Sequence, residues 1–189
     1  MARLGVNKDY LKKRNRGLVL QLIATGKCTS RIELAREVHL TKTAISAIVN
    51  ELIEQGYLRE AAVTTKAKLG RTPVKLEISP EAPKYIGILF GRGCLEAAIC
   101  DLNMNIIAYE RVEREWSGGQ EIMEVAYRLL DRLLEREEKI IAIGVATPGP
   151  VDVKKGRIIN PGYFHGIQNL DVAEPIQKRY GIPVFLDHD

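Results

Sequence analysis

Residues 30–56 hold the pattern that most constrains the fold of this chain, two short helical segments joined by a tight turn. Ser30 and Glu33 have the S-x-x-E spacing of a capping box, which predicts a helix that starts directly after Ser30. Thr41 can cap a second helix, and Gly56 is a suitable residue to end it. The order and lengths of these segments predict a helix-turn-helix.

The second helix of this pair has two faces of different chemistry. Its apolar residues recur at the spacing of an amphipathic helix and predict a buried side, formed by Ile45, Val49, Leu52 and Ile53. The opposite side carries small and polar residues, namely Thr43, Ser46, Ala47 and Asn50. Such side chains suit contact with base edges in a major groove of DNA, and Thr41 and Lys42 begin the helix as further candidate contacts.

Two other helices are expected to pack on the apolar side of this one. The first helix of the pair has a predicted inner face of Ile32, Ala35 and Val38. A longer helix over residues 8–25 has a predicted buried stripe of Leu11, Leu18, Leu22 and Ile23. The result is a three-helix unit.

A strand pair is predicted after these helices, over residues 57–63 and 74–78, with the basic loop TTKAKLGRTP between the strands. A strand pair with such a loop, directly after a helix-turn-helix, forms a wing. Gly70 and Arg71 lie in the loop, and narrow A·T-rich minor grooves attract arginine. Both residues are therefore candidate DNA contacts, and an ordinary solvated loop arginine is the alternative.

Charge is divided unevenly along the chain. Residues 1–79 hold 15 Lys or Arg against 7 Asp or Glu, a net charge of +8, whereas residues 80–189 hold 13 against 17, a net charge of −4. Attraction to phosphates supplies most of the non-specific affinity of proteins for DNA. The basic leading part therefore favours DNA binding over a helical pair that only packs.

A proline-punctuated connector at residues 79–83 separates a domain of residues 1–79 from a domain of residues 84–189. The second domain is predicted to run strand, strand, strand, helix, strand, helix, strand, over residues 85–90, 94–101, 106–113, 120–136, 140–146, 172–180 and 183–186. This order predicts an α/β fold, preceded by an N-terminal α+β domain.

The sequence favours neither a membrane protein nor a metal-binding protein. No apolar run approaches the roughly 20 residues that cross a bilayer, so no membrane partner is expected. Cys28, Cys94 and Cys100 lack C-x-x-C spacing, which argues against a disulfide framework or a zinc site and suits the cytoplasm. We therefore expect neither a metal nor a cofactor in this chain.

Three segments of the second domain resemble motifs of the ROK family (repressors, open reading frames and sugar kinases). They are GVATPGPVD at residues 144–152, IINPGYFHGIQNLDVAEPI at residues 158–176 and PVFLDHD at residues 183–189. With the helix-turn-helix in front, essentially the whole chain resembles the repressor branch, which includes xylose and N-acetylglucosamine repressors. The resemblance implies the first lobe of an actin-like (ribonuclease H-like) ATPase fold.

The phosphate loop departs from the pattern of the family's kinases. Where they have D-x-G-G-T, this chain has Leu89, Phe90, Gly91, Arg92 and Gly93. A leucine cannot ligate magnesium, which takes oxygen ligands. Phosphoryl transfer depends on that metal and on phosphate binding, so we expect that the chain is not an enzyme.

The resemblance also implies a sugar-binding cleft with Gly149, His188 and Asp189. Gly149 would allow close approach of a ligand to the backbone. Asp189 matches the catalytic base of the kinases and would only hydrogen-bond a sugar hydroxyl in a repressor. His188 stands where the family usually has Asn, which leaves the identity of the sugar open.

The family's second lobe, with its Cys/His zinc motif, has no counterpart in these 189 residues. By resemblance, the chain is either truncated before that lobe or lacks a half that was not included. In such a half-fold we expect the central sheet to be uncovered on one face, which favours association.

The favoured hypothesis is a transcriptional repressor of sugar-utilisation genes. It would bind a double-stranded DNA operator as a homodimer or higher oligomer and sense a small sugar. A ROK-family sugar kinase with an N-terminal DNA-binding extension is the alternative. A shortened chain that only binds DNA is a third hypothesis.

Overall fold

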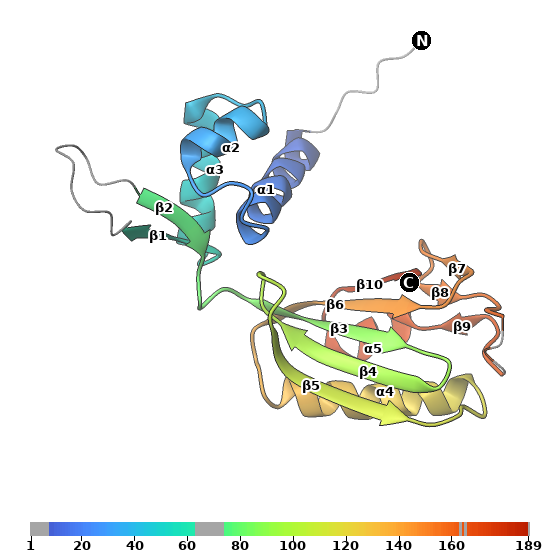
Figure 1. Cartoon of the computed structure of the whole chain (residues 1–189). Coiled ribbons are helices and arrows are strands. Elements are labelled where there is room, and N and C mark those ends of the chain that lie inside the picture. The colour runs from blue at the N-terminus through green and yellow to red at the C-terminus, as the bar shows by residue number, and fades with distance from the viewer. Residues whose placement is uncertain (1–7, 63–73, 163, 165, 189) are drawn as a thin grey trace, which may run out of the picture. The chain divides into compact units, whose positions relative to one another are not determined.

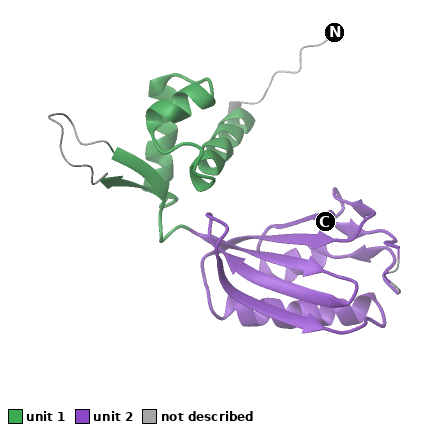
Figure 2. Ribbon diagram, viewed as in Figure 1, with its two compact units in different colours: residues 1–82 green, residues 83–189 purple. Residues whose placement is uncertain are grey.

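The structure is a computed structural model, and it describes residues 8–62, 74–162, 164 and 166–188. The chain forms two compact units, unit 1 with residues 1–82 and unit 2 with residues 83–189 (Figure 2). No helix in the described ranges is both long and apolar enough to cross a membrane.

The described part of unit 1 has three helices and an antiparallel strand pair (Figure 1). They are α1 (Lys8–Ala24), α2 (Arg31–Glu37), α3 (Lys42–Glu54), β1 (Leu58–Ala62) and β2 (Val74–Ile78). Leu58 pairs with Ile78 and Ala62 with Val74. The predicted helix-turn-helix and the strand pair that follows it are therefore confirmed, while the loop of the wing lies outside the described residues.

Local sequence signals account for the helix starts in unit 1. The Ser30 hydroxyl accepts a hydrogen bond from the backbone N–H of Glu33 (3.3 Å), and the Glu33 carboxylate accepts one from the N–H of Ser30 (3.1 Å). This reciprocal pair is the predicted capping box. His39, in the turn after α2, has a left-handed backbone with φ of 56°, a conformation that histidine adopts more readily than bulky or β-branched residues.

The predicted buried faces of α1 and α2 were partly wrong. Leu11, Leu18 and Ile32 are 41%, 38% and 53% exposed. In α2 the buried side chain is Leu34, with no exposed surface. A helix of only seven residues buries whichever side chain meets its neighbours, and here Leu34 takes that place. The core of unit 1 is formed by Val19, Leu22, Ile23, Leu34, Ile45, Ile48, Val49, Leu52, Leu58 and Leu76.

Unit 2 is built on a mixed sheet with the strand order β10-β6-β3-β4-β5 among the described residues. The larger elements are β3 (Lys84–Phe90), β4 (Cys94–Cys100), β5 (Ile106–Glu113), α4 (Gly119–Leu134), β6 (Ile140–Thr147), α5 (Ala173–Tyr180) and β10 (Val184–His188). Strand β6 runs parallel to both β3 and β10, whereas β4 is antiparallel to β3 and β5. The predicted α/β order is therefore confirmed. Three two-residue strands that the sequence did not predict form a second small sheet, namely β7 (Val151–Asp152), β8 (Arg157–Ile158) and β9 (Leu170–Asp171).

The two faces of the large sheet differ in cover. Helices α4 and α5 lie on one face (Figure 1), where alternate strand residues such as Ile86, Leu95 and Ile143 join the core of unit 2. Among the described residues of unit 2, no helix covers the other face, which we call the open face. One row of directly paired residues crosses it from β10 to β5, in the order Phe185, Gly144, Gly87, Ala98 and Tyr109.

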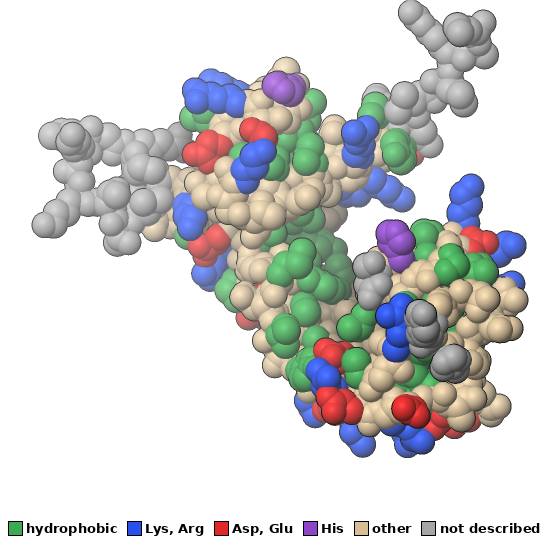
Figure 3. Space-filling model, turned by 45° about the vertical axis from the view of Figure 1, so that its right-hand side comes forward, with side chains coloured by type: hydrophobic (Ala, Val, Ile, Leu, Met, Phe, Trp, Pro, Cys, Tyr) green, Lys and Arg blue, Asp and Glu red, His purple; other side chains and the backbone are tan. Residues whose placement is uncertain are grey.

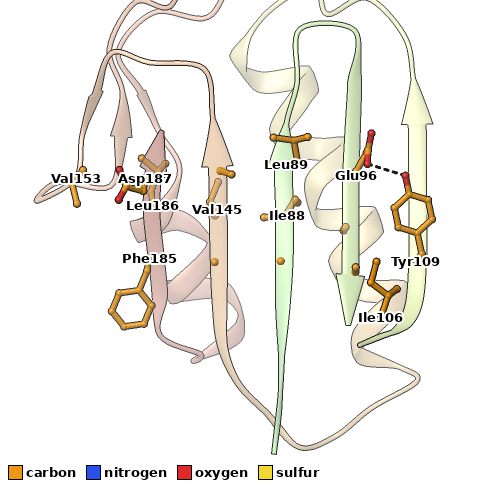
Figure 4. Close-up of a pocket in the computed structure, with 15 residues that line it drawn as sticks. Ile88, Leu89, Glu96, Ile106, Tyr109, Val145, Val153, Phe185, Leu186 and Asp187 are labelled. Atoms are coloured by element: carbon orange, nitrogen blue, oxygen red, sulfur yellow. Dashed lines mark hydrogen bonds between the residues drawn. The ribbon is translucent and has the colours of Figure 1, made fainter. Parts of the chain in front are cut away.

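The open face is hollow in the middle and raised at its sides. The hollow (Figure 4) has a volume of about 730 Å³. Gly87, Ala98 and Gly144 are among the residues that line it. Phe185 on β10 is 67% exposed and Tyr109 on β5 is 46% exposed. Hydrophobic side chains are visible on the surface of unit 2 in Figure 3.

Candidate functional site

The exposed side of α3 is the first candidate site. Thr41 begins the helix, because its hydroxyl accepts a hydrogen bond from the N–H of Ala44 (3.2 Å). Burial of Ile45, Ile48, Val49 and Leu52 fixes the rotation of the helix. The side opposite these four residues carries a stripe at helical spacing, which we call the outer stripe, made of Thr43, Ala47, Asn50 and Glu54, all exposed.

Arg31 connects this helix to its two neighbours. One of its guanidinium nitrogens donates to the backbone carbonyl of Ser46 in α3 (3.2 Å). The other lies 2.8 Å from the Glu60 carboxylate in β1. Arg31 itself opens α2, so one side chain joins α2, α3 and the first strand of the wing. No periodic pattern in the sequence points to this role.

Positive charge from α1 compensates an acid on α3. The Glu51 carboxylate accepts a hydrogen bond from Lys12 (3.0 Å) and is also paired with Arg16. The hydrogen bond from Lys12, together with the nearby Arg16, lowers the pKa of Glu51 below its usual range. Glu51 therefore carries its charge at neutral pH as part of an ion-pair group, and Lys and Arg side chains stand on the surface of unit 1 (Figure 3).

The predicted DNA contacts take different positions in the structure. Lys42, Thr43 and Asn50 are exposed. Ser46 is half-buried beside the outer stripe, with its carbonyl bound to Arg31, and the hydroxyl of Thr41 serves the helix cap. Gly70 and Arg71 lie outside the described residues.

The second candidate site lies where β6 and β10 end side by side. Thr147 pairs with His188 across these parallel strands, so the loop after β6 starts next to the end of β10. A Cβ placed on Gly149 would lie 3.5 Å from the Cβ of His188. Two of the three sugar-binding residues implied by the resemblance are thus neighbours, and the third, Asp189, lies outside the described residues. Within the described ranges, no group of His, Cys, Asp and Glu side chains could hold a metal ion.

The loop after β3, where the family resemblance places the phosphate loop of the kinases, is held from three directions. The N–H of Gly91 donates to the carbonyl of Cys94 (2.8 Å), and the indole N–H of Trp116 donates to the carbonyl of Gly91 (2.9 Å). The Arg92 side chain donates to the carbonyl of Gly162 (3.0 Å). Leu89 lines the hollow of the open face, directly opposite Glu96 on β4 (Figure 4).

Comparison with known families and proteins gives matches to both units. The ROK family model matches residues 85–189, and a winged helix-turn-helix DNA-binding model matches residues 13–59. The DNA-binding transcriptional repressor Mlc of Escherichia coli (strain K12) is 25% identical over 185 residues, which are 96% of this chain and 46% of that protein. A xylose repressor of Caldicellulosiruptor bescii is 28% identical over 188 residues, 97% of this chain and 47% of that protein.

The solved structures agree on the fold. The crystal structure of a ROK family transcriptional regulator, a homologue of the E. coli Mlc protein, matches with a TM-score of 0.75 at 24% identity. The match covers 96% of this chain and 46% of that chain. This chain therefore spans less than half the length of the relatives that it matches.

Proposed function

The chain belongs to the ROK family, and from this premise we propose that it is a DNA-binding transcriptional regulator, a cytoplasmic repressor of sugar-utilisation genes. The observation that carries the proposal is the outer side of α3, which is polar, exposed and part of a basic domain. A helix of this kind is suited to the major groove, where the N-terminal residues of a recognition helix contact base edges.

The contacts divide between the base edges and the phosphate backbone. Thr43, Ser46 and Asn50 face the bases, and Lys42 in the first turn reaches the phosphates. Gly70 and Arg71, in the loop of the wing, contact the adjacent minor groove. A homodimer or higher oligomer places two such units on the two half-sites of an operator, about one helical turn or a multiple of it apart.

The proposed control is a small sugar bound beside Gly149, His188 and Asp189. Its support is the family resemblance together with the position of Gly149 beside His188. A sugar that prefers the arrangement with low DNA affinity would shift the population toward it and release the operator. Calorimetry with xylose, glucose and N-acetylglucosamine tests this part, and a chain that binds none of them while still binding DNA would contradict it.

We further propose that unit 2 does not transfer phosphate. Leu89 offers no oxygen to a metal ion, and Arg92 is engaged with the carbonyl of Gly162. The repressor names of the curated relatives also support this view. In a coupled ATP-consumption assay with hexoses and pentoses, we expect no turnover, whereas sugar-dependent ATP use would favour a kinase.

DNA binding is tested with duplex fragments from around the protein's own gene. In fluorescence anisotropy titrations we expect binding that weakens steeply as salt is raised, because bound counterions are released from the phosphates. Arg71→Ala should weaken binding at least severalfold. Unchanged affinity of that variant would remove the wing from the proposal, and the absence of salt-sensitive binding to any fragment would contradict the proposed function.

A further inference from the structure

We propose that the outer stripe of α3 recognises A·T base pairs in each operator half-site, through the amide of Asn50 and the methyl group of Ala47. This inference rests on the proposed function, and it names the base composition that the helix selects. It depends on which chemical groups the outer stripe presents and on which groups are absent from it.

Asn50 supplies the hydrogen bonds for adenine. It lies on the side of α3 away from the core, and its exposed side chain has no hydrogen-bond partner among the described residues. A carboxamide has one acceptor and two donors, so it can bond N6 and N7 of adenine at the same time. Guanine presents two acceptors in the major groove and cannot donate to the amide oxygen.

Ala47 supplies an apolar contact for thymine. It is exposed in the middle of the outer stripe, three residues before Asn50. Three residues of α-helix rise about 4.5 Å, close to the roughly 3.4 Å between stacked base pairs. The methyl group of Ala47 can therefore reach the same base pair as Asn50 or an adjacent one. Thymine alone carries a C5-methyl group in the major groove, and alanine is a favourable neighbour for it.

The groups that would select G·C pairs are missing from this part of the stripe. The sequence of α3 contains no arginine, the side chain that most often contacts guanine. By helical spacing, Lys42 lies about 140° around the helix from Ala47. The guanidinium of Arg31 is engaged by the Ser46 carbonyl and by Glu60. Glu54, which could accept from cytosine, is the last residue of α3, away from the N-terminal part that enters the groove.

The test begins with selection of duplexes from a randomised library by the full chain, which identifies the half-site. Each thymine of the selected duplex is then replaced, one at a time, by deoxyuridine, which lacks the C5-methyl group. Affinity is measured by anisotropy for wild type and for Ala47→Gly. Ala44→Gly is the matched control, because it makes the same backbone change in the same helix at an alanine that is half-buried instead of exposed.

For wild type we expect a thymine in each half-site whose replacement weakens binding about fourfold, the effect of one methyl-sized apolar contact. Ala47→Gly should lose this sensitivity, and Ala44→Gly should keep it. Asn50→Ala should weaken binding at least about fivefold and relax the preference for adenine at one position. Deoxyuridine leaves the protein unaltered, so the result does not depend on the folding of a variant.

The outcomes separate this inference from the proposed function. Selected half-sites without A·T pairs, or equal deoxyuridine sensitivity in wild type and Ala47→Gly, would overturn the base assignment while DNA binding itself stands. Failure to select any duplex, with no salt-sensitive binding, would overturn both.

Discussion

The outer stripe of α3 and the open face of the sheet are both exposed and both built from small residues, yet they differ in chemistry. Thr43, Ala47 and Asn50 come from one helix and offer polar groups and small methyl groups. The open face draws on five strands, and large apolar side chains such as Phe185 flank its glycine floor. Polar side chains can remain in contact with water, whereas exposed apolar side chains gain free energy when they are covered.

The outer stripe and the open face also differ in how the fold builds them. A substitution on the outer stripe changes one side chain of a single helix. On the open face, strand register brings Gly87 and Gly144 side by side, although a Cβ on either residue would meet no atom within 4 Å. The hollow is therefore a property of the sheet as a whole. We expect the stripe to act through specific contacts with DNA and the open face to act through apolar association.

The largest expected effect is a loss of stability in unit 1 that leaves the stability of unit 2 unchanged. Leu34 is fully buried in unit 1, and Leu34→Ala should cost about 2–5 kcal/mol and abolish DNA binding. The only tryptophan, Trp116, lies in unit 2, so its fluorescence reports the unfolding of that unit. In urea titrations we expect an early loss of helical circular dichroism with an unchanged tryptophan transition.

Leu129→Ala, in the core of unit 2, is the matched control and should move the tryptophan transition instead. If Leu34→Ala shifted the tryptophan transition equally, the two units would not be separate in stability.

The next effect concerns the open face. Phe185→Gln should raise the dissociation constant for self-association by at least about tenfold, because a large apolar side chain would no longer be buried between copies. Sedimentation velocity over a range of concentrations measures this. Tyr10→Gln, at a similarly exposed aromatic residue of α1, is the control and should leave association unchanged. Equal association of wild type and Phe185→Gln would exclude the open face as the contact.

A smaller effect is expected at Arg31, which joins α3 to β1. Arg31→Gln should weaken DNA binding several times more than Arg36→Gln, which removes the same charge from an exposed position of the same helix. The loss of stability should be roughly 1 kcal/mol, typical of a partly exposed ion pair with a further hydrogen bond. Anisotropy and thermal unfolding measure the two quantities. Equal affinities of the two variants would mean that Arg31 contributes to DNA binding only through its positive charge.

The smallest effect depends on pH. The pKa of Glu51 is lowered, so its pairing with Lys12 and Arg16 stabilises unit 1 above the usual glutamate pKa of about 4.3. This stabilisation is lost as pH falls through the lowered pKa. Wild type should therefore be more stable than Glu51→Gln at neutral pH, and the difference should vanish in acid. A difference that persisted in acid, in thermal unfolding, would refute this role.

Sequence periodicity predicted the stripe well, because helical spacing is local. The opposition of Asn50 to the buried Ile48 and Leu52 follows from 3.6 residues per turn. Periodicity predicted the burial of Leu11, Leu18 and Ile32 less well, because burial also depends on the surface against which a helix packs. Gly149 and His188 are neighbours in the fold although they are far apart in sequence. Only a family resemblance could suggest that these two residues are close. No pattern in the sequence indicated that Arg31 joins α2 to α3 and β1.

The central claim is that duplex DNA binds to the outer side of α3. It is tested most directly by backbone amide NMR of the 189-residue chain, titrated with a selected duplex. The account predicts shift changes concentrated at residues 41–50 and 70–71, with the sheet residues of unit 2 unchanged. Shift changes confined to unit 2, with residues 41–50 unaffected at saturation, would contradict it.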